Sequence, residues 1–354
     1  MTIKKHSADP LSILIILMGS LGDVARGLCL VSHIKQYQPN GRVTWLIEPK
    51  WVELVKAHRE IDEIIVFERS WHLSPVRKLK KDLAARHFDI TLDLQRHFKS
   101  GFFSYISGAK RRIGFHRHNA KEFNWIFNNE RIGFFSDDLP KLHHYLKFTE
   151  YLGLPAPTSL DFGLSEIALK NIAPGLHEKI NEKPGISVVL GSSWESKDWF
   201  RDQYFRLIQN LLSLGREKVI LLGDRSNVPI AASLTAGIGS SGIINTVGKT
   251  SLIELIGILK SSAAAVGPDS GPGHVAAAVG TPYVTLFGPT SPRRVAPFGC
   301  SHLVVQADVD CSPCNKKRCP NPERICMRQI KIEDVEEKLI RALSMGRVSD
   351  RYLI

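Results

Sequence analysis

Short apolar runs, each followed by a polar turn and then by a helical stretch, recur along both halves of this 354-residue chain. The first run, Ile-Leu-Ile-Ile-Leu-Met at 13–18, has no polar position, which is typical of a strand buried on both faces of a parallel sheet. Parallel strands need crossover connections, which helices supply, so the alternation predicts two doubly wound α/β domains. The predicted strands are 13–18, 42–48, 63–67, 88–94, 185–190, 218–222, 263–266 and 282–287.

Four prolines interrupt the alternation between residues 154 and 184. A domain boundary is therefore predicted there, with one domain at 1–170 and a second at 171–354. The second domain includes a cysteine-rich loop at 311–326 and a terminal amphipathic helix at 332–343. Ligands of doubly wound sheets bind at the carboxyl ends of the strands. Each half supplies a glycine-rich turn at such an end, which predicts a site in a cleft between the two domains.

The charge balance points to an anionic partner. The chain holds 47 Lys and Arg against 35 Asp and Glu, a net charge of +12, and the stretch 51–121 is its most basic part. Such an excess suits nucleic acid, a phosphorylated small molecule or an acidic membrane surface, and a well-solvated surface is the alternative. No apolar run approaches the roughly 20 residues that span a bilayer, and no signal-peptide cleavage pattern follows 13–18. We expect a cytoplasmic protein.

The first motif with chemical potential is Gly19-Ser-Leu-Gly22-Asp23, directly after the first predicted strand. Glycines at this place let the backbone approach a ligand closely and open a helix whose amides favour anions. The pattern is neither a Walker A loop nor Gly-x-Gly-x-x-Gly. Asp23 is either a helix cap or a general base that faces the predicted cleft.

Two further turns suit an anionic ligand. Gly191-Ser-Ser-Trp-Glu-Ser-Lys197 places a lysine among hydroxyl groups after the first strand of the second half. The sequence Gly267-Pro-Asp-Ser-Gly-Pro-Gly-His274 combines a strand, a glycine-rich turn and a helix of small residues. Free amides and the positive end of such a helix favour a phosphate or diphosphate. A solvent-facing lysine is the alternative for Lys197.

Four of the six cysteines follow the spacing Cys311-x2-Cys314-x4-Cys319-x6-Cys326. In a cytosolic protein this clustering favours a metal or reduced thiols over disulfides. Zinc, an iron–sulfur cluster, reduced structural thiols and a disulfide all remain open. Because the spacing is irregular, we expect reduced structural thiols, with zinc at the four cysteines as the competing interpretation.

Together these segments resemble the ADP-heptose:lipopolysaccharide heptosyltransferases of glycosyltransferase family 9. The resemblance rests on Ser-Leu-Gly-Asp at 20–23, Ser-Ser-Trp-Glu-Ser-Lys at 192–197, Asp-Ser-Gly-x-x-His at 269–274 and the downstream Phe-Gly-Pro-Thr-x-Pro. It runs from about residue 12 to about residue 345. The cysteine-rich stretch at 311–327 is similar to the tail of the heptosyltransferase II type.

The resemblance implies a GT-B fold and an inverting, metal-independent enzyme that transfers heptose from ADP-L-glycero-D-manno-heptose to the inner core of lipopolysaccharide. By position, Asp23 matches the proposed base of the family, and Lys197 matches its diphosphate-binding lysine. Thr250 falls where the family contacts adenine through its backbone. The nucleotide-sugar loop of the family corresponds to Asp269, Ser270, Gly271 and His274.

The same resemblance gives the basic stretch 51–121 a use, because the lipopolysaccharide core and lipid A are rich in carboxylate and phosphate. The expected acceptor contacts are Arg112, Arg117 and Lys121, and the enzyme is expected to work peripherally at the inner face of the cytoplasmic membrane. Three alternatives stay open: a family 9 enzyme with another sugar or acceptor, a non-catalytic sugar-nucleotide-binding protein, and a nucleic-acid-binding protein. The last does not explain two phosphate-type turns in separate domains.

Overall fold

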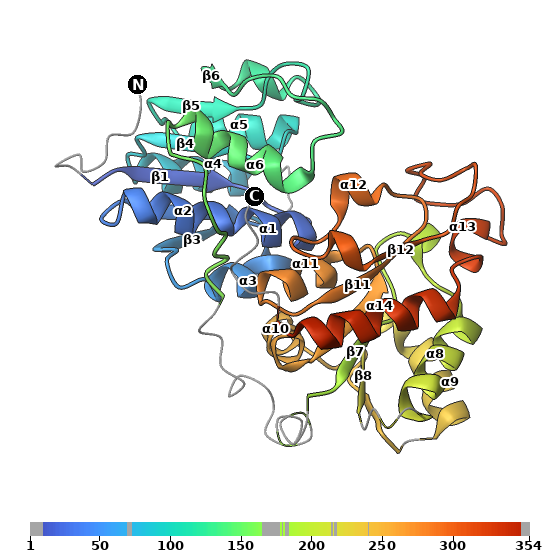
Figure 1. Cartoon of the computed structure of the whole chain (residues 1–354). Helices are drawn as coiled ribbons and strands as arrows, with labels where there is room; N and C mark the ends of the chain where they lie inside the picture. Colours follow the sequence, from blue (N-terminus) through green and yellow to red (C-terminus); the bar gives the residue numbers. More distant parts are fainter. Residues whose placement is uncertain are drawn as a thin grey trace. The chain divides into compact units, whose positions relative to one another are not determined.

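The computed structural model describes residues 10–68, 73–164, 178, 180, 184–213, 215, 218–239 and 241–347. The chain divides into two compact units, Met1–Glu166 with Leu353–Ile354, and Ile167–Tyr352. Figure 1 draws the first unit in blue to green and the second in yellow-green to red. The predicted boundary at residue 170 lies outside the described residues.

The first unit is built on a six-stranded parallel sheet in the order β3-β2-β1-β4-β5-β6. Its strands are β1 (Ser12–Ile16), β2 (Arg42–Ile47), β3 (Glu63–Val66), β4 (Ile90–Asp93), β5 (Arg111–Gly114) and β6 (Glu130–Arg131). Helices α1, α2 and α6 pack against one another, and α4 packs against α5. The helices are α1 (Leu21–Gly27), α2 (Cys29–Tyr37), α3 (Val52–Lys56), α4 (Leu73–Ala84), α5 (Phe98–Ile106) and α6 (Lys141–Tyr151).

The second unit repeats the design with the sheet order β12-β11-β10-β7-β8-β9, again entirely parallel. Its strands are β7 (Ile186–Val189), β8 (Val219–Leu222), β9 (Ile243–Asn245), β10 (Ala264–Pro268), β11 (Tyr283–Phe287) and β12 (Val304–Gln306). Its helices are α8 (Arg201–Ser213), α9 (Val228–Ile238), α10 (Leu252–Ser261), α11 (Gly271–Ala278), α12 (Pro292–Val295), α13 (Ile325–Arg328) and α14 (Ile332–Met345). Two doubly wound parallel sheets confirm the predicted fold class.

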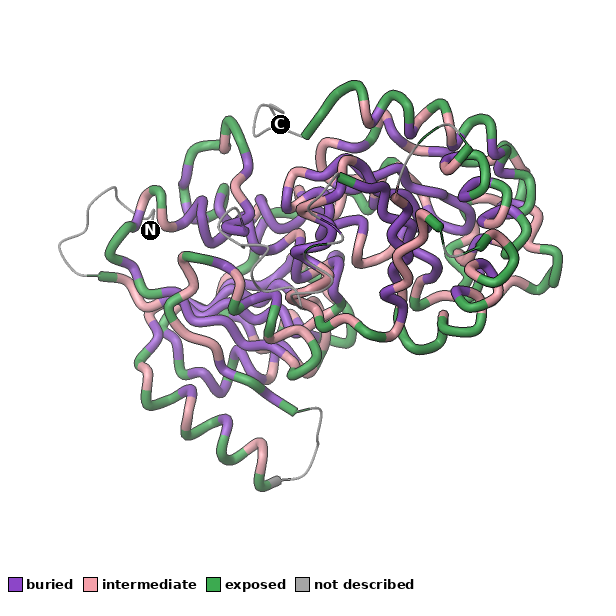
Figure 2. The backbone as a smooth tube through the Cα atoms, turned by 90° about the horizontal axis from the view of Figure 1, so that it is seen from below, coloured by how far each residue is buried: buried purple, intermediate pink, exposed green. Residues whose placement is uncertain are grey.

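Burial follows the sequence pattern that predicted the sheets. Residues 13–16 in β1 are 0% exposed, and Figure 2 shows buried backbone in the interior of each unit with exposed residues around it. Such strands are covered on both faces, as a parallel sheet requires. In the described part of the chain, no helix has the length and apolarity needed to cross a membrane.

Two buried tyrosines hold the ends of β7 and β10, the strands that precede the predicted turns at 191–197 and 267–274. Tyr204 donates its hydroxyl to the carbonyl of Val189 at 2.9 Å, and Tyr283 donates to the carbonyl of Pro268 at 3.2 Å. Both side chains are 0% exposed, so these bonds satisfy polar groups that would otherwise be buried without a partner. The ends of β7 and β10 are thereby anchored in the core of the second unit.

Candidate functional site

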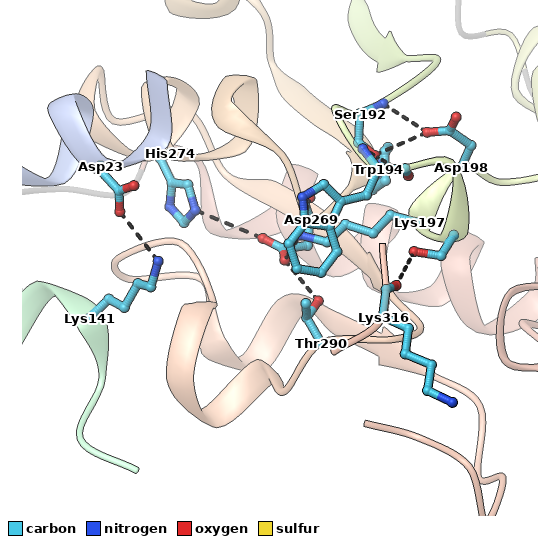
Figure 3. Close-up of polar contacts among 12 residues, drawn as sticks. Asp23, Lys141, Ser192, Trp194, Lys197, Asp198, Asp269, His274, Thr290 and Lys316 are labelled. Carbon is cyan, nitrogen blue, oxygen red and sulfur yellow. Dashed lines mark hydrogen bonds and ion pairs between the residues drawn. The ribbon is translucent and has the colours of Figure 1, made fainter. Parts of the chain in front are cut away.

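In the first unit, Asp23 is the centre of a polar cluster at the carboxyl end of β1. It occupies the first turn of α1, and Ser20 before the helix donates its hydroxyl to Asp23 Oδ2 at 2.9 Å. Asp23 Oδ1 accepts from Arg26 Nη1 at 2.8 Å, from Lys141 Nζ at 3.4 Å and from the Tyr145 hydroxyl at 3.2 Å. Figure 3 shows Asp23 and the Lys141 side chain pointing toward each other. Asp23 therefore completes the capping box of α1, accepting the backbone N–H of Ser20 at 3.4 Å, and also accepts hydrogen bonds from three other side chains.

The charges of Lys141 and Arg26 keep Asp23 ionised. Burial opposes the charged form, but Lys141, Arg26 and the hydrogen bonds from Ser20 outweigh it and hold the pKa of Asp23 below its ordinary value. Burial and the neighbouring Asp23 carboxylate raise the pKa of Tyr145, which therefore remains a hydrogen-bond donor. Asp23 is a carboxylate at neutral pH, with both oxygens already accepting hydrogen bonds.

The turn that carries Asp23 is held from two sides. Gln95 Oε1 accepts a hydrogen bond from the backbone N–H of Met18 at 2.8 Å. A Cβ atom at Gly19 would lie 2.7 Å from Trp51 Nε1, so only glycine allows this close approach. Gln95 follows β4, the neighbour of β1 in the sheet. The turn that carries Asp23 thus lies between β1 and β4, where the strand order of the sheet reverses.

In the second unit, Lys197 and Asp269 form a buried ion pair. Lys197 Nζ lies 2.6 Å from Asp269 Oδ2 and 3.3 Å from the Asp269 carbonyl oxygen, and it also lies 4.4 Å from the Trp194 ring centroid. The Lys197 and Asp269 side chains are 13% and 7% exposed. Lys197 ends a short turn after β7, and Asp269 follows β10, the strand paired with β7. The predicted lysine is therefore brought to the predicted glycine-rich turn (Figure 3).

Two neighbours complete this cluster around Asp269. Thr290 donates its hydroxyl to Asp269 Oδ2 at 2.8 Å, and His274 Nε2 lies 3.9 Å from Asp269 Oδ1. Ser270 is the residue before α11, and Gly271 is the first residue of that helix. The first amides of a helix lack intrahelical partners and favour negative charge. The cluster thus combines a lysine, a hydroxyl and a helix N-terminus, groups that together can bind an anion.

Thr250 lies apart from these contacts along the same sheet edge. It follows β9 and directly precedes Ser251, which caps α10 by accepting a hydrogen bond from Glu254 N at 3.3 Å. Among the interactions of the described residues, none joins Thr250 directly to Asp269 or Lys197. Its predicted adenine contact remains a prediction.

The three predicted acceptor residues have different surroundings. Arg112 lies in β5, where its guanidinium donates to the carbonyls of Ala109 at 2.9 Å and Phe127 at 3.1 Å. Arg117 and Lys121 are exposed in the loop after β5. The contacts of Arg112 are therefore structural in this state, whereas the other two side chains are open to solvent.

The four clustered cysteines are free thiols in the second unit. They line a cavity of about 240 Å³, from exposed Cys311 to buried Cys326. Burial, followed by the charges of the other three cysteines, raises the pKa of Cys326. Within the described ranges, no three His, Cys, Asp or Glu side chains are arranged to hold a metal ion. Asp308 and Asp310, which form an Asp-x-Asp sequence directly before the first of these cysteines, are both exposed.

Sequence reasoning missed the partners of both central carboxylates. Arg26 is one helical turn from Asp23, and its i,i+3 spacing was the available signal. Lys141 and Tyr145 are 118 and 122 residues away, and no local pattern connects them to Asp23. Thr290 belonged to a recognised motif, but its bond to Asp269 depends on the pairing of β10 with β11.

Two doubly wound parallel units of this kind are the architecture of GT-B glycosyltransferases. A family model described as glycosyltransferase family 9 (heptosyltransferase) matches residues 76–324, and the chain belongs to this family. It is accordingly a glycosyltransferase of the heptosyltransferase family.

Curated relatives carry three different names. The chain is 28% identical to lipopolysaccharide core heptosyltransferase OpsX of Haemophilus influenzae, over 82% of each chain. It is 25% identical to lipopolysaccharide heptosyltransferase 1 of Pseudomonas aeruginosa, over 87% of each chain. It is 24% identical to lipooligosaccharide heptosyltransferase 2 of H. influenzae, over 84% of this chain and 88% of that one. These identities do not select a heptosyltransferase type.

Solved structures agree with the fold. A family 9 glycosyltransferase from Veillonella parvula superposes with a TM-score of 0.81 at 18% identity, over 96% of this chain and 99% of that one. The E. coli heptosyltransferase WaaC with ADP superposes with a TM-score of 0.76 at 20% identity, over 94% of this chain and 100% of that one. At these identities the likeness concerns the fold alone.

Proposed function

We propose that this protein transfers heptose from ADP-heptose to the core of lipopolysaccharide, with inversion at the anomeric carbon. The names of its curated relatives support this reaction, as does the solved WaaC structure with ADP-2-deoxy-2-fluoro heptose. The observation that carries the proposal is the Lys197–Asp269 pair beside the N-terminus of α11, which offers a nucleoside diphosphate a cation and free amides at one place.

The donor diphosphate takes the place of Asp269 as the partner of Lys197. Lys197 reaches Asp269 through a single ammonium group, so a rotation of its flexible side chain is enough to transfer the contact to a phosphate oxygen. Ser270 and Gly271 supply amides at the start of α11 to the same anion, and His274 lies on the first turns of that helix. In this proposal, Thr250 contacts the adenine. Lys197 then stabilises the negative charge that grows on the departing ADP.

Asp23 is the general base in this proposal. The acceptor hydroxyl has a high pKa, so its attack on the anomeric carbon benefits from a positioned base, which is typically worth about 10²–10⁴ in rate. A carboxylate that is held by Arg26, Lys141 and Tyr145 is weakly basic, because each donor stabilises its charged form. The Lys141 contact is the longest of the three, at 3.4 Å. An anionic acceptor that draws Lys141 toward itself raises the basicity of Asp23 when the substrate is in place.

The acceptor is anionic in this account. Arg117 and Lys121 are exposed in the loop after β5, within the most basic stretch of the chain, and they suit phosphate or carboxylate groups. Arg112 contributes only if it leaves its two backbone carbonyls. Work on a lipid-linked acceptor brings the enzyme to the inner face of the cytoplasmic membrane as a peripheral protein.

The heptosyltransferase II type is the finer proposal, and the cysteine-rich stretch at 311–327 supports it. Its test is a choice of acceptors. The purified protein is given ADP-heptose with heptose-free lipopolysaccharide or with lipopolysaccharide that already carries one core heptose, and mass spectrometry detects added heptose. Transfer to the second acceptor alone supports the type II proposal. Transfer to the heptose-free acceptor alone overturns the type II assignment but not the proposed heptosyl transfer. Transfer to neither acceptor overturns the proposed function.

A further inference from the structure

The loop that carries the clustered cysteines contacts the turn that carries Lys197. Ser196, the residue before Lys197, is 2% exposed, and its hydroxyl donates to the carbonyl of Lys316 at 2.7 Å. Its backbone N–H donates to the carbonyl of Lys317 at 3.3 Å. Lys317 Nζ also lies 5.9 Å from the centroid of the Trp194 ring. The loop therefore holds the turn through its backbone and through the ring next to Lys197.

Arg324 joins the two ends of the same turn. Its Nη1 atom donates to the carbonyl of Glu195 at 2.6 Å and to the carbonyl of Asp198 at 3.0 Å. These residues begin and follow the short helical turn Glu195–Lys197. One guanidinium nitrogen thus fixes the separation of the two carbonyls that flank Lys197. Hydrogen bonds from a charged donor are the stronger class, so this bridge restrains the turn more than a neutral contact would.

Arg324 is itself held in an uncommon conformation. Its φ angle is 43°, in the left-handed region that non-glycine residues adopt at a cost. Its guanidinium lies 4.4 Å from the ring centroid of Phe200, and Arg328 lies 3.6 Å from the same ring. The surrounding contacts therefore determine the direction of the Arg324 side chain.

The loop also holds the other neighbour of the Lys197–Asp269 pair. Asn315 N donates to the carbonyl of Pro289 at 2.7 Å, and Pro289 directly precedes Thr290, whose hydroxyl binds Asp269. Between these attachments lies the thiol-lined cavity of about 240 Å³. Ser196 and Pro289, which the loop holds by hydrogen bonds, both line this cavity.

We propose that Arg324 is a positioning residue for the donor diphosphate: it holds the Glu195–Lys197 turn in the conformation that directs Lys197 toward Asp269 and the N-terminus of α11. The proposal rests on the proposed function, since it assumes that the anion bound there is the diphosphate of ADP. Arg324 contacts the turn through the backbone carbonyls of Glu195 and Asp198.

The test measures ADP and AMP binding to the full-length protein by calorimetry. AMP lacks the β-phosphate, so the preference for ADP over AMP reports the contact with Lys197, whereas a general loss of folding would weaken both ligands. Arg324→Ala should lower ADP affinity about tenfold, because Lys197 then loses its one charge-assisted hydrogen bond to the β-phosphate. AMP affinity should stay unchanged. Arg324→Lys should restore part of the preference, since an ammonium can donate to a carbonyl but does not stack on Phe200 as the planar guanidinium does.

Arg328→Ala is the matched control. Arg328 lies in the same segment, stacks on the same Phe200 ring and pairs with Asp202 at 2.6 Å, on α8 beyond the Lys197 turn. It should keep the wild-type preference for ADP. If Arg324→Ala does not fold, Ser196→Ala replaces it, because this change removes only the hydroxyl bond to Lys316, and it should also reduce the preference.

The outcomes separate the two proposals. If Lys197→Ala abolishes the preference for ADP while Arg324→Ala and Ser196→Ala keep it at the wild-type value, the positioning role is overturned and the donor site stands. The positioning role is also overturned if Arg324→Ala and Arg328→Ala lose the preference for ADP equally, since the loss would then come from the whole segment that carries both arginines. If the wild-type protein does not bind ADP, the proposed function fails and the positioning role fails with it.

Discussion

Lys197 and Asp269 form an ion pair with 2.6 Å between Nζ and Oδ2, and both side chains are largely removed from water. Breaking such a pair without replacing either partner leaves a buried charge uncompensated. We propose that a bound diphosphate replaces the carboxylate as the partner of Lys197. Thr290 donates to Asp269 Oδ2 at 2.8 Å and can keep this hydrogen bond when Lys197 turns to the donor.

Replacement of Lys197 tests this exchange. Lys197→Ala should weaken ADP binding and reduce turnover by about 2–4 kcal/mol in transition-state terms, because the leaving group loses its cation. Lys197→Arg should restore part of both, since a planar fork differs from a point charge. Calorimetry with ADP and steady-state kinetics measure the two effects. Unchanged ADP affinity in Lys197→Ala would show that the lysine does not contact the diphosphate.

The variant Asp23→Asn distinguishes a general-base role of Asp23 from a role in capping α1. Asparagine keeps an oxygen that can accept the Ser20 hydroxyl, but it cannot take up a proton from the acceptor. We expect kcat to fall by roughly 10²–10⁴ while ADP affinity stays near the wild-type value. Initial rates with saturating donor measure the first effect and calorimetry the second. Turnover close to that of the wild type would mean that Asp23 only caps α1.

The surroundings of Asp23 predict a specific pH dependence. Asp23 acts as a base only when it is deprotonated, and its pKa lies below the ordinary value, so the acid limb of kcat/KM that it produces lies in the acidic range. Lys141 makes the largest contribution that lowers this pKa. Lys141→Ala should therefore raise the pKa of Asp23 and move the acid limb to higher pH.

The control for this experiment is Lys147→Ala. Lys147 lies on the same helix α6 but pairs with Glu150 at 2.7 Å and not with Asp23. Its pH profile should match that of the wild type. An acid limb that stays in place in Lys141→Ala, or moves equally in both variants, argues against Asp23 as the titrating base.

How far the sequence predicted the fold depends on the length of each element. Every predicted strand is present, because a run such as 13–18 combines sufficient length with complete apolarity. Strands β5, β6, β9 and β12 were not predicted, because each has only two to four residues and lies in no long apolar run. Helix α5 was not predicted either, since its Gly101 weakens the helical pattern. A Cβ atom there would lie 2.8 Å from Asn124, so the glycine serves close packing.

The sequence was enough to predict the turns that carry the site residues, but not the contacts between side chains that are far apart in the sequence. Asp23, Lys197 and Asp269 each follow a strand, so their placement at a sheet edge could be expected. The Lys197–Asp269 pair required the knowledge that β7 and β10 are neighbours, although 72 residues separate the two side chains. Lys141 reaches Asp23 from a helix at the other end of the first unit's sequence. Such pairs depend on strand order, which local patterns do not specify.

The cysteine cluster gives a prediction about metal dependence. Transfer should continue after treatment with a chelator, because Lys197 and the amides of α11 supply the charge that the leaving group needs. Elemental analysis of protein purified without added metal identifies any ion held by the four thiols. One equivalent of zinc per chain would overturn the expectation of reduced structural thiols. Loss of activity on chelation would overturn the metal-independent mechanism as well.

A transfer assay with purified protein, ADP-heptose and lipopolysaccharide acceptors that lack core heptose or carry one tests the proposed reaction itself. ADP should be released in step with the addition of one heptosyl residue to an acceptor, seen by mass spectrometry, and NMR should show the new linkage with the anomeric configuration opposite to that of the donor. Retention of the donor configuration, or transfer from a UDP-sugar or GDP-sugar while ADP-heptose is left intact, would rule this reaction out.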